Sequence, residues 1–145
     1  MEIESVIMQI YEQAKHIGAC HLFTGEEKSL DDLVSLFLSP QGIEFCTKKH
    51  FPNLSTFRLF KQQAVDKKYG IYIDSGEISL QNPSIAVLVG KTMATIDVDE
   101  CARHRIVLLH GAKAVVNASK WAVASITSSV GCNVIRNRTD NAIIL

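Results

Sequence analysis

The sequence predicts an α+β protein in which an N-terminal helical cap of about four helices precedes a C-terminal body resembling a β-solenoid. Three observations carry this prediction. Apolar residues before Gly70 recur with the spacing of helices, and those after it recur with the period of strands. Small residues in the second part also return every ten positions, at Ala102, Ala112, Ala122, Cys132 and Ala142. We assign residues 1–69 to the cap and residues 70–145 to the β-repeat body, and expect them to form one compact unit.

Four helices are expected in the cap. The first covers about 3–17, where apolar residues follow the i, i+3, i+4, i+7 spacing of one buried helix face. The second begins at Ser29, in a capping box that has aspartate in place of glutamate. The third runs from Pro40 to about Lys49, because proline suits the first helical position. The fourth covers about 55–67.

Three short strands are expected directly after Gly70. Ile71–Ile73 and Ile78–Leu80 flank a segment, Asp74-Ser75-Gly76-Glu77, that has the composition of a tight turn. Asn82-Pro83 marks a second turn. Ile85–Val89 is a continuous apolar run typical of a strand, and a glycine ends it.

The ten-residue interval describes one short strand followed by a tight corner. In each unit the first position is small, the third is small or apolar, and the fifth is β-branched, which is the alternation of a strand with one buried face. His104 interrupts the row of third positions, and Arg136 ends the row of fifth positions. Such a unit cannot bury its own apolar face, so it must stack on its neighbours.

Two geometries satisfy this pattern. In a β-solenoid successive strands line different faces, and each coil uses about two units; in an antiparallel meander or sandwich successive strands pair directly. Ladders of like side chains favour the solenoid, because parallel stacking places equivalent residues beside one another. We expect four alanines to point inward and to stack in register with their counterparts ten residues away: Ala112, Ala114, Ala122 and Ala124.

Composition and charge argue against several classes of protein. The apolar fraction of 47% and the charged fraction of 21% are those of a globular chain. Fifteen basic residues balance fifteen acidic ones, so nucleic acid is not an expected partner. No apolar run has the length of about 20 residues that a membrane-spanning helix needs. The acidic N-terminus, Met1-Glu2-Ile3-Glu4, lacks the basic character of a secretory signal, so we expect a cytoplasmic protein with reduced thiols.

Several short elements resemble a family of small uncharacterised bacterial proteins with an N-terminal helical part and a C-terminal short-strand β-repeat part. The resemblance is carried by Gly70–Asp74, by Asn82-Pro83 with Ile85–Gly90 after it, and in the helical part by Phe45-Cys46 and His50-Phe51-Pro52. It implies the same two-part architecture for this chain. The family has no assigned activity, so the resemblance adds no catalytic residue.

A metal site has weak candidates only. His16 with Cys20, and Cys46 with His50, are two Cys/His pairs at the i, i+4 spacing that puts both side chains on one helix face. Four such ligands would suit zinc. An equally good interpretation is that both cysteines are small core residues and that the histidines lie at helix ends. We therefore predict no metal and no cofactor.

Titratable residues cluster around one predicted turn, and they suggest an enzymatic alternative. They are Asp97, Asp99, Glu100, Cys101, His104 and His110. A Cys–His or Asp–His pair could serve a small hydrolase or transferase with a site where the helices meet the β body. Sequence proximity does not show that such groups touch. The other reading is a solvated turn, and we assign no catalytic residue.

The favoured hypothesis is a non-enzymatic protein-interaction or self-assembly module. Five residues are the candidate binding residues: Trp121, Arg136, Arg138, Ile143 and Leu145. Trp121 either caps an adjacent corner or anchors a partner. The apolar strand that ends at Leu145 has no gatekeeping charge after Asp140, which favours a homo-oligomer, with a dimer first, or contact with another protein. Alternatively the tail folds back beneath the helices. The sequence does not define a small-molecule ligand.

Overall fold

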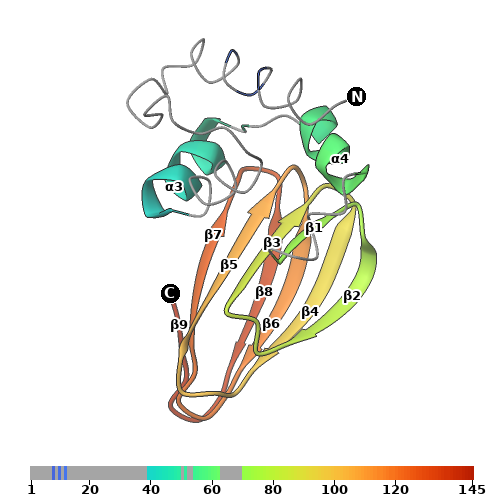
Figure 1. Cartoon of the computed structure of the whole chain (residues 1–145). Helices are drawn as coiled ribbons and strands as arrows, with labels where there is room; N and C mark the ends of the chain where they lie inside the picture. Colours follow the sequence, from blue (N-terminus) through green and yellow to red (C-terminus); the bar gives the residue numbers. More distant parts are fainter. Residues whose placement is uncertain are drawn as a thin grey trace. The chain divides into compact units, whose positions relative to one another are not determined.

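The computed structural model describes residues 8, 10, 12, 39–49, 51, 54–62 and 70–145, and side chains are described up to residue 58 in the last helix (Figure 1). The chain divides into two compact units, Met1–Gln63 and Ala64–Leu145. The first holds the helices and the second holds the strands.

The described part of the first unit contains two short helices, where the sequence analysis predicted four. They are α3 (Pro40–Lys49) and α4 (Leu54–Gln62). The helices expected at about 3–17 and from Ser29 onward lie almost entirely outside the described residues. No helix in the described part of the chain is long and apolar enough to cross a membrane.

Helix α3 has the bounds predicted for the third helix, and its ends explain them. The Ser39 hydroxyl oxygen accepts a hydrogen bond from the Gly42 N–H at 3.1 Å and so caps the N-terminus, with Pro40 at the first helical position. Lys48 and Lys49 occupy the last turn, where cations interact favourably with the helix dipole.

The second unit is a β-solenoid of about four coils with parallel strands. Figure 1 shows its two sheets facing each other. Sheet A has the strand order β1-β3-β5-β7-β9, and sheet B has the order β2-β4-β6-β8. Every pairing is parallel, which excludes the meander and the antiparallel sandwich. The strands are β1 (Ile71–Ile73), β2 (Gly76–Gln81), β3 (Ile85–Val89), β4 (Thr92–Val98), β5 (Arg103–Leu109), β6 (Lys113–Ala118), β7 (Val123–Ser128), β8 (Asn133–Arg138) and β9 (Ile143–Ile144).

The ladders repeat every twenty residues, not every ten. Ala114 pairs with Ala94 on one side and with Val134 on the other. The ten-residue unit is one strand with its corner, and each coil contains two such units. A residue's counterpart ten positions away therefore lies in the opposite sheet, so the predicted in-register stacking at ten residues is wrong. The first coil is shorter, since Ile71 pairs with Val87.

The small residue that opens each unit stands directly after a tight corner. The backbone N–H groups of Ala112, Ala122, Cys132 and Ala142 each donate to the carbonyl oxygen three residues earlier, at 3.2–3.3 Å. At each corner at least one of the two central residues has a positive φ, as in His110 (55°) and Lys120 (56°). The chain then turns inward immediately, and three of these four small residues are fully buried. An alanine-sized side chain fits because the two sheets are joined closely there.

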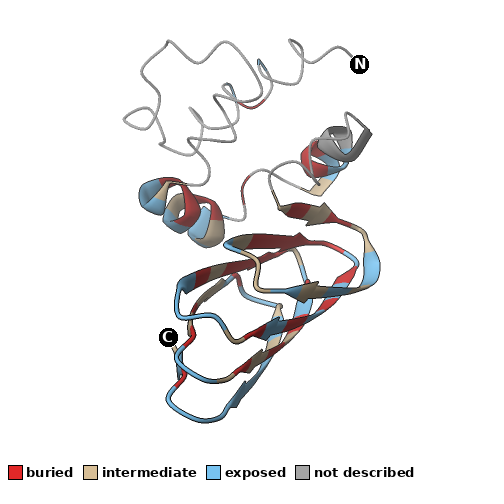
Figure 2. Cartoon of the chain, turned by 60° about the horizontal axis from the view of Figure 1, so that its bottom comes forward, coloured by how far each residue is buried: buried red, intermediate tan, exposed pale blue. Residues whose placement is uncertain are grey.

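Buried residues recur along the strands of both sheets (Figure 2). Alternate residues fill a common interior, in which Ala112, Ala114, Ala122 and Ala124 are all buried as predicted. Ala102 is exposed, and its N–H donates to the carbonyl of Glu100, two residues earlier, at 2.8 Å, so the corner before β5 differs from those that follow it. Strands β3 and β5 are buried on their outer faces too. The outward residues Val87, Val89, Val107 and Leu109 are almost inaccessible, which accounts for the continuous apolar run in β3.

Enlarging an interior alanine should destabilise the solenoid. Ala124 is fully buried between His104 and Ile144 in the ladder of sheet A. We expect Ala124→Leu to lower the free energy of unfolding by about 1–3 kcal/mol through overpacking. Urea denaturation measures this loss of stability, and Lys113→Leu, on the exposed face of β6, is the control. An unchanged midpoint for Ala124→Leu would contradict the interior packing described above.

Candidate interaction surface

The last coil leaves one edge of each sheet unpaired within residues 70–145. Strand β8 pairs only with β6, and β9 pairs only with β7. Along β8 the N–H of Asn133 donates to the Ala112 carbonyl at 3.2 Å, and the N–H of Thr139 donates to the Ala118 carbonyl at 2.9 Å. Backbone groups in a parallel ladder alternate in direction. Those of Val134, Arg136 and Arg138 therefore point away from β6.

Two arginines stand at the positions that earlier coils fill with interior side chains. Arg136 continues the column of Ile96 and Val116, and Arg138 continues the column that ends at Ala118. Both arginines are exposed. Their aliphatic stems can cover the open end of the interior while the guanidinium groups stay in water. The break in the pattern at Arg136 is thus the end of the apolar interior.

Three large apolar side chains form a second feature of this end, which we call the apolar patch: Trp121, Ile143 and Leu145. They are 64%, 46% and 65% exposed. The N–H of Ile143 donates to the carbonyl of Ala122, next to Trp121, at 3.0 Å. Residues 143 and 145 alternate with the inward Ile144, so they belong to the outer face of sheet A. The tail thus extends sheet A as β9.

The structure brings all five candidate binding residues to the last two coils. Arg136 and Arg138 lie on β8, and the apolar patch belongs to the corner before β7 and to β9. Exposed apolar side chains that gather in one place, beside polar ones, are typical of an interaction site. This surface is the candidate functional site.

The acidic turn holds two corners together. The Asn82 side-chain amide donates to Asp99 Oδ1 at 2.8 Å, and the Asp99 N–H donates back to Asn82 Oδ1 at 2.8 Å. Lys120 Nζ lies 3.6 Å from Asp99 Oδ2. The hydrogen bond from Asn82, with the positive charge of Lys120, holds the pKa of Asp99 below its usual value. Asp99 therefore links corners of successive coils.

This linkage predicts a pH dependence. A carboxyl whose pKa is lowered in the folded state stabilises the fold above the ordinary value of 3.8, and the contribution is lost as the pH falls through the lowered value. We expect Asn82→Ala to raise the pKa of Asp99 toward 3.8 and to reduce stability at neutral pH more than at acidic pH. NMR titration of the Asp99 carboxyl carbon measures the shift. An unchanged pKa in the variant would contradict the assigned role of Asn82.

His104 is a structural residue of the interior. Its side chain is buried, with Nδ1 2.8 Å from the carbonyl oxygen of Pro83 and Nε2 3.4 Å from that of Glu100. Both ring nitrogens thus face backbone carbonyls of two corners, and neither faces the exposed Cys101. The Cys–His and Asp–His pairs that the enzymatic alternative would need therefore do not form at His104.

A polar ladder on the outer face of sheet B was missed by the sequence analysis. Asn117 Nδ2 donates to Asp97 Oδ1 at 2.9 Å, and Asn137 Nδ2 donates to Asn117 Oδ1 at 2.8 Å. These three residues, with Ser119 and Thr139, line a shallow hollow of about 330 Å³. Asp97, Asn117 and Asn137 stand twenty residues apart, which is the length of one coil. A search of the sequence for polar residues at this interval would have found them.

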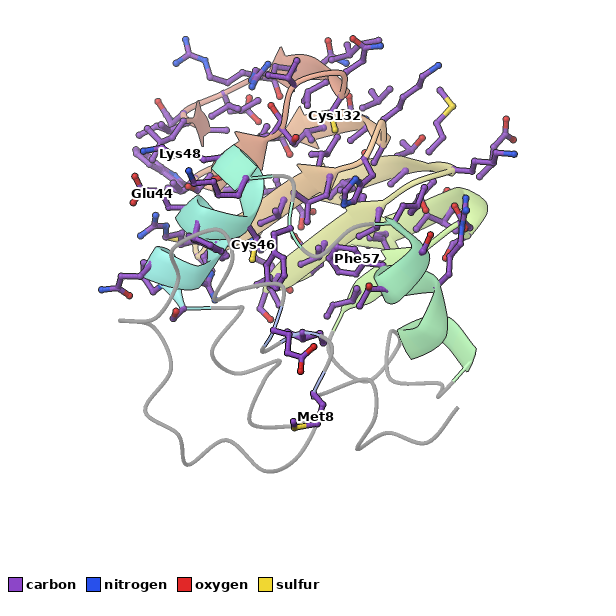
Figure 3. All side chains as sticks on the ribbon, turned by 90° about the horizontal axis from the view of Figure 1, so that it is seen from above. Met8, Glu44, Cys46, Lys48, Phe57 and Cys132 are labelled. Carbon is purple, nitrogen blue, oxygen red and sulfur yellow. The ribbon has the colours of Figure 1, made fainter. Side chains whose placement is uncertain are left out.

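The metal candidates are mostly outside the described residues, since His16, Cys20 and His50 are not placed. Cys46 is buried in α3, on which the exposed Glu44 and Lys48 form an ion pair of 2.7 Å (Figure 3). Burial raises the pKa of the Cys46 thiol to about 12, as expected of a core cysteine. Among the described residues no three His, Cys, Asp or Glu side chains gather as a metal site.

Comparison with known proteins gives no relative: no family model matches the chain, and no curated protein and no solved structure is significantly similar to it.

Proposed function

We propose that this chain is a non-enzymatic protein-interaction module that associates with a second copy of itself through the apolar patch. The observation that supports it most directly is the exposure of Trp121, Ile143 and Leu145 on one end of a regular solenoid. Burying them against the same patch of a second chain removes apolar surface from water, and closed twofold pairing is the commonest form of such association.

The titratable groups favour this proposal over a hydrolase or transferase. Asp99 is bound by Asn82 and Lys120, and the ring nitrogens of His104 face two backbone carbonyls. These groups therefore hold corners of the solenoid. The free thiols of Cys46, Cys101 and Cys132 fit a reducing compartment, so we place the module in the cytoplasm. Membership of the small bacterial family that the sequence resembles belongs to the same proposal.

Trp121 provides a direct test because it is the only tryptophan of the chain. Light scattering should give about twice the monomer mass of 16.0 kDa at tens of micromolar. Over the same concentrations the tryptophan emission should move to shorter wavelength as the ring leaves water. The double variant Ile143→Lys, Leu145→Lys should remain a monomer with constant emission.

Ile135→Lys is the matched control, because Ile135 is equally exposed but lies on sheet B. It should dimerise like the unmodified chain. A monomer with constant Trp121 emission across the full concentration range would overturn the proposed self-association.

A further inference from the structure

We propose that the unpaired edge of β8 binds an acidic, extended segment of a partner protein as an added strand, with carboxylates facing Arg136 and Arg138. This inference rests on the proposed interaction role but uses a different surface from the apolar patch. The apolar patch belongs to β9 of sheet A and to the corner before β7, whereas the β8 edge belongs to sheet B.

The backbone of β8 carries a row of unpaired polar groups at its outer edge. The N–H and C=O groups of Val134, Arg136 and Arg138 point away from β6, and no strand in residues 70–145 receives them. An extended peptide can pair with such a row through its own main chain. This mode of binding requires peptide groups on the partner, which a polynucleotide does not have.

Two side chains of β8 add positive charge to this edge. Arg136 and Arg138 stand two residues apart, so their side chains leave the same side of the strand about 7 Å from each other. Both are exposed, and neither has a carboxylate partner within the described residues. The nearest acid along the chain, Asp140, accepts the backbone N–H of Lys120 at 3.0 Å. Carboxylates at alternate positions of an added strand would face both guanidinium groups.

The opposite face of β8 completes the recognition pattern. Ile135 stands one position before Arg136 on β8 and points outward, where it is 58% exposed. Its neighbour on β6 is Val115. The added strand would place its remaining side chains beside Ile135, so apolar residues should alternate with the acidic ones. The predicted ligand therefore alternates acidic and β-branched residues.

The same charges argue against a second copy as the occupant of this edge. Two β8 strands paired edge to edge would bring four arginines together, and like charges directly opposite each other destabilise a strand pair. A further regular coil would bury Arg136 and Arg138 in its apolar interior, which is costly for unpaired charges. An acidic strand neutralises them instead.

Three fluorescein-labelled peptides of about ten residues test the proposal on the full chain. In the first, glutamate and valine alternate; in the second, lysine replaces glutamate; in the third, proline replaces valine, which keeps the charge but removes the N–H groups that strand pairing needs. Fluorescence anisotropy should show binding of the first peptide. The second and third should bind at least about tenfold more weakly, a difference of about 1.4 kcal/mol.

Variants and amide exchange locate the contact. Arg136→Glu with Arg138→Glu should weaken binding about tenfold, whereas Lys91→Glu with Lys113→Glu, the same change in net charge elsewhere on the solenoid, should leave it unchanged. Bound peptide should slow hydrogen exchange at the Val134, Arg136 and Arg138 amides. Because the peptides act on the unmodified protein, the test does not depend on a variant that must fold.

Three outcomes would overturn strand addition at β8. The first is equal binding of the proline peptide, the second is binding without slower exchange at these amides, and the third is a single-stranded RNA that binds more tightly at Arg136 and Arg138 than the peptide does. Self-association is tested independently. The Ile143→Lys, Leu145→Lys variant should bind the peptide normally, so a failure of either proposal is distinguishable from a failure of the other.

Discussion

Replacing Leu108 with alanine is expected to lower the free energy of unfolding of the solenoid by about 3 kcal/mol. Leu108 is fully buried in the interior, in register with Leu88 in the preceding coil and with Ser128 in the next. Removal of the Leu108 side chain leaves a cavity. The flanking strands close it only in part, because hydrogen bonds fix them on both sides. The loss of buried apolar surface and the cavity both lower the free energy of unfolding.

The control for this prediction is Ile135→Ala, which removes an equally large side chain from an exposed position on β8. It should change the free energy of unfolding by less than about 0.5 kcal/mol. Urea denaturation followed by circular dichroism measures both variants. Equal losses for Leu108 and Ile135 would show that the interior does not carry the stability of the coils.

The solenoid could be predicted because its coils repeat one backbone geometry. The corners place a small residue at the same position, as in Ala112 and Ala122, and the sequence shows this regularity as a ten-residue interval. What the sequence does not contain is the pairing partner. An interval of ten fits stacking at ten residues or at twenty, and only the parallel pairs of Ala114 with Ala94 and Val134 decide between them.

The first turn shows the same limit. Asp74–Glu77 has the composition of a tight turn between two short strands, which is also the signature of a hairpin. In the structure only Asp74 and Ser75 join β1 in sheet A to β2 in sheet B, because β2 already begins at Gly76. The Ser75 N–H donates to Thr92 Oγ1 in the next coil at 3.0 Å. Local turn chemistry is alike in hairpins and corners. The hydrogen bond between Ser75 and Thr92, seventeen residues apart, distinguishes the corner from a hairpin.

The candidate surface was predictable residue by residue but not as an assembly. Trp121 and Ile143 stand out in the sequence as apolar residues in polar or terminal surroundings. Their proximity depends on the hydrogen bond from Ile143 to Ala122, which follows from the twenty-residue ladder. His104 stood out as a polar residue in an apolar row, but the two carbonyls that it reaches come from different corners. Long-range register thus determined the proximity of Trp121 to Ile143 and the partners of His104.

Gly70 marks the start of the solenoid, and Gly70→Ala is expected to destabilise it by about 3 kcal/mol. Its φ of +73° is unfavourable for alanine, and a Cβ there would lie 2.6 Å from the carbonyl oxygen of Ile85. Relief of that contact requires a backbone shift, which would strain the 2.8 Å hydrogen bond from the Val87 N–H to the Gly70 carbonyl. The first coil depends on this bond for its alignment with β3.

Gly111→Ala separates the two causes. Gly111 also has a positive φ, +82°, but a Cβ there meets no atom within 4 Å. Only the backbone preference is then lost, so we expect a cost of about 1 kcal/mol. Urea denaturation of both variants should therefore place the midpoint of Gly70→Ala well below that of Gly111→Ala. Equal midpoints would mean that β1 and β3 separate without loss of stability, and that the solenoid effectively begins at β3.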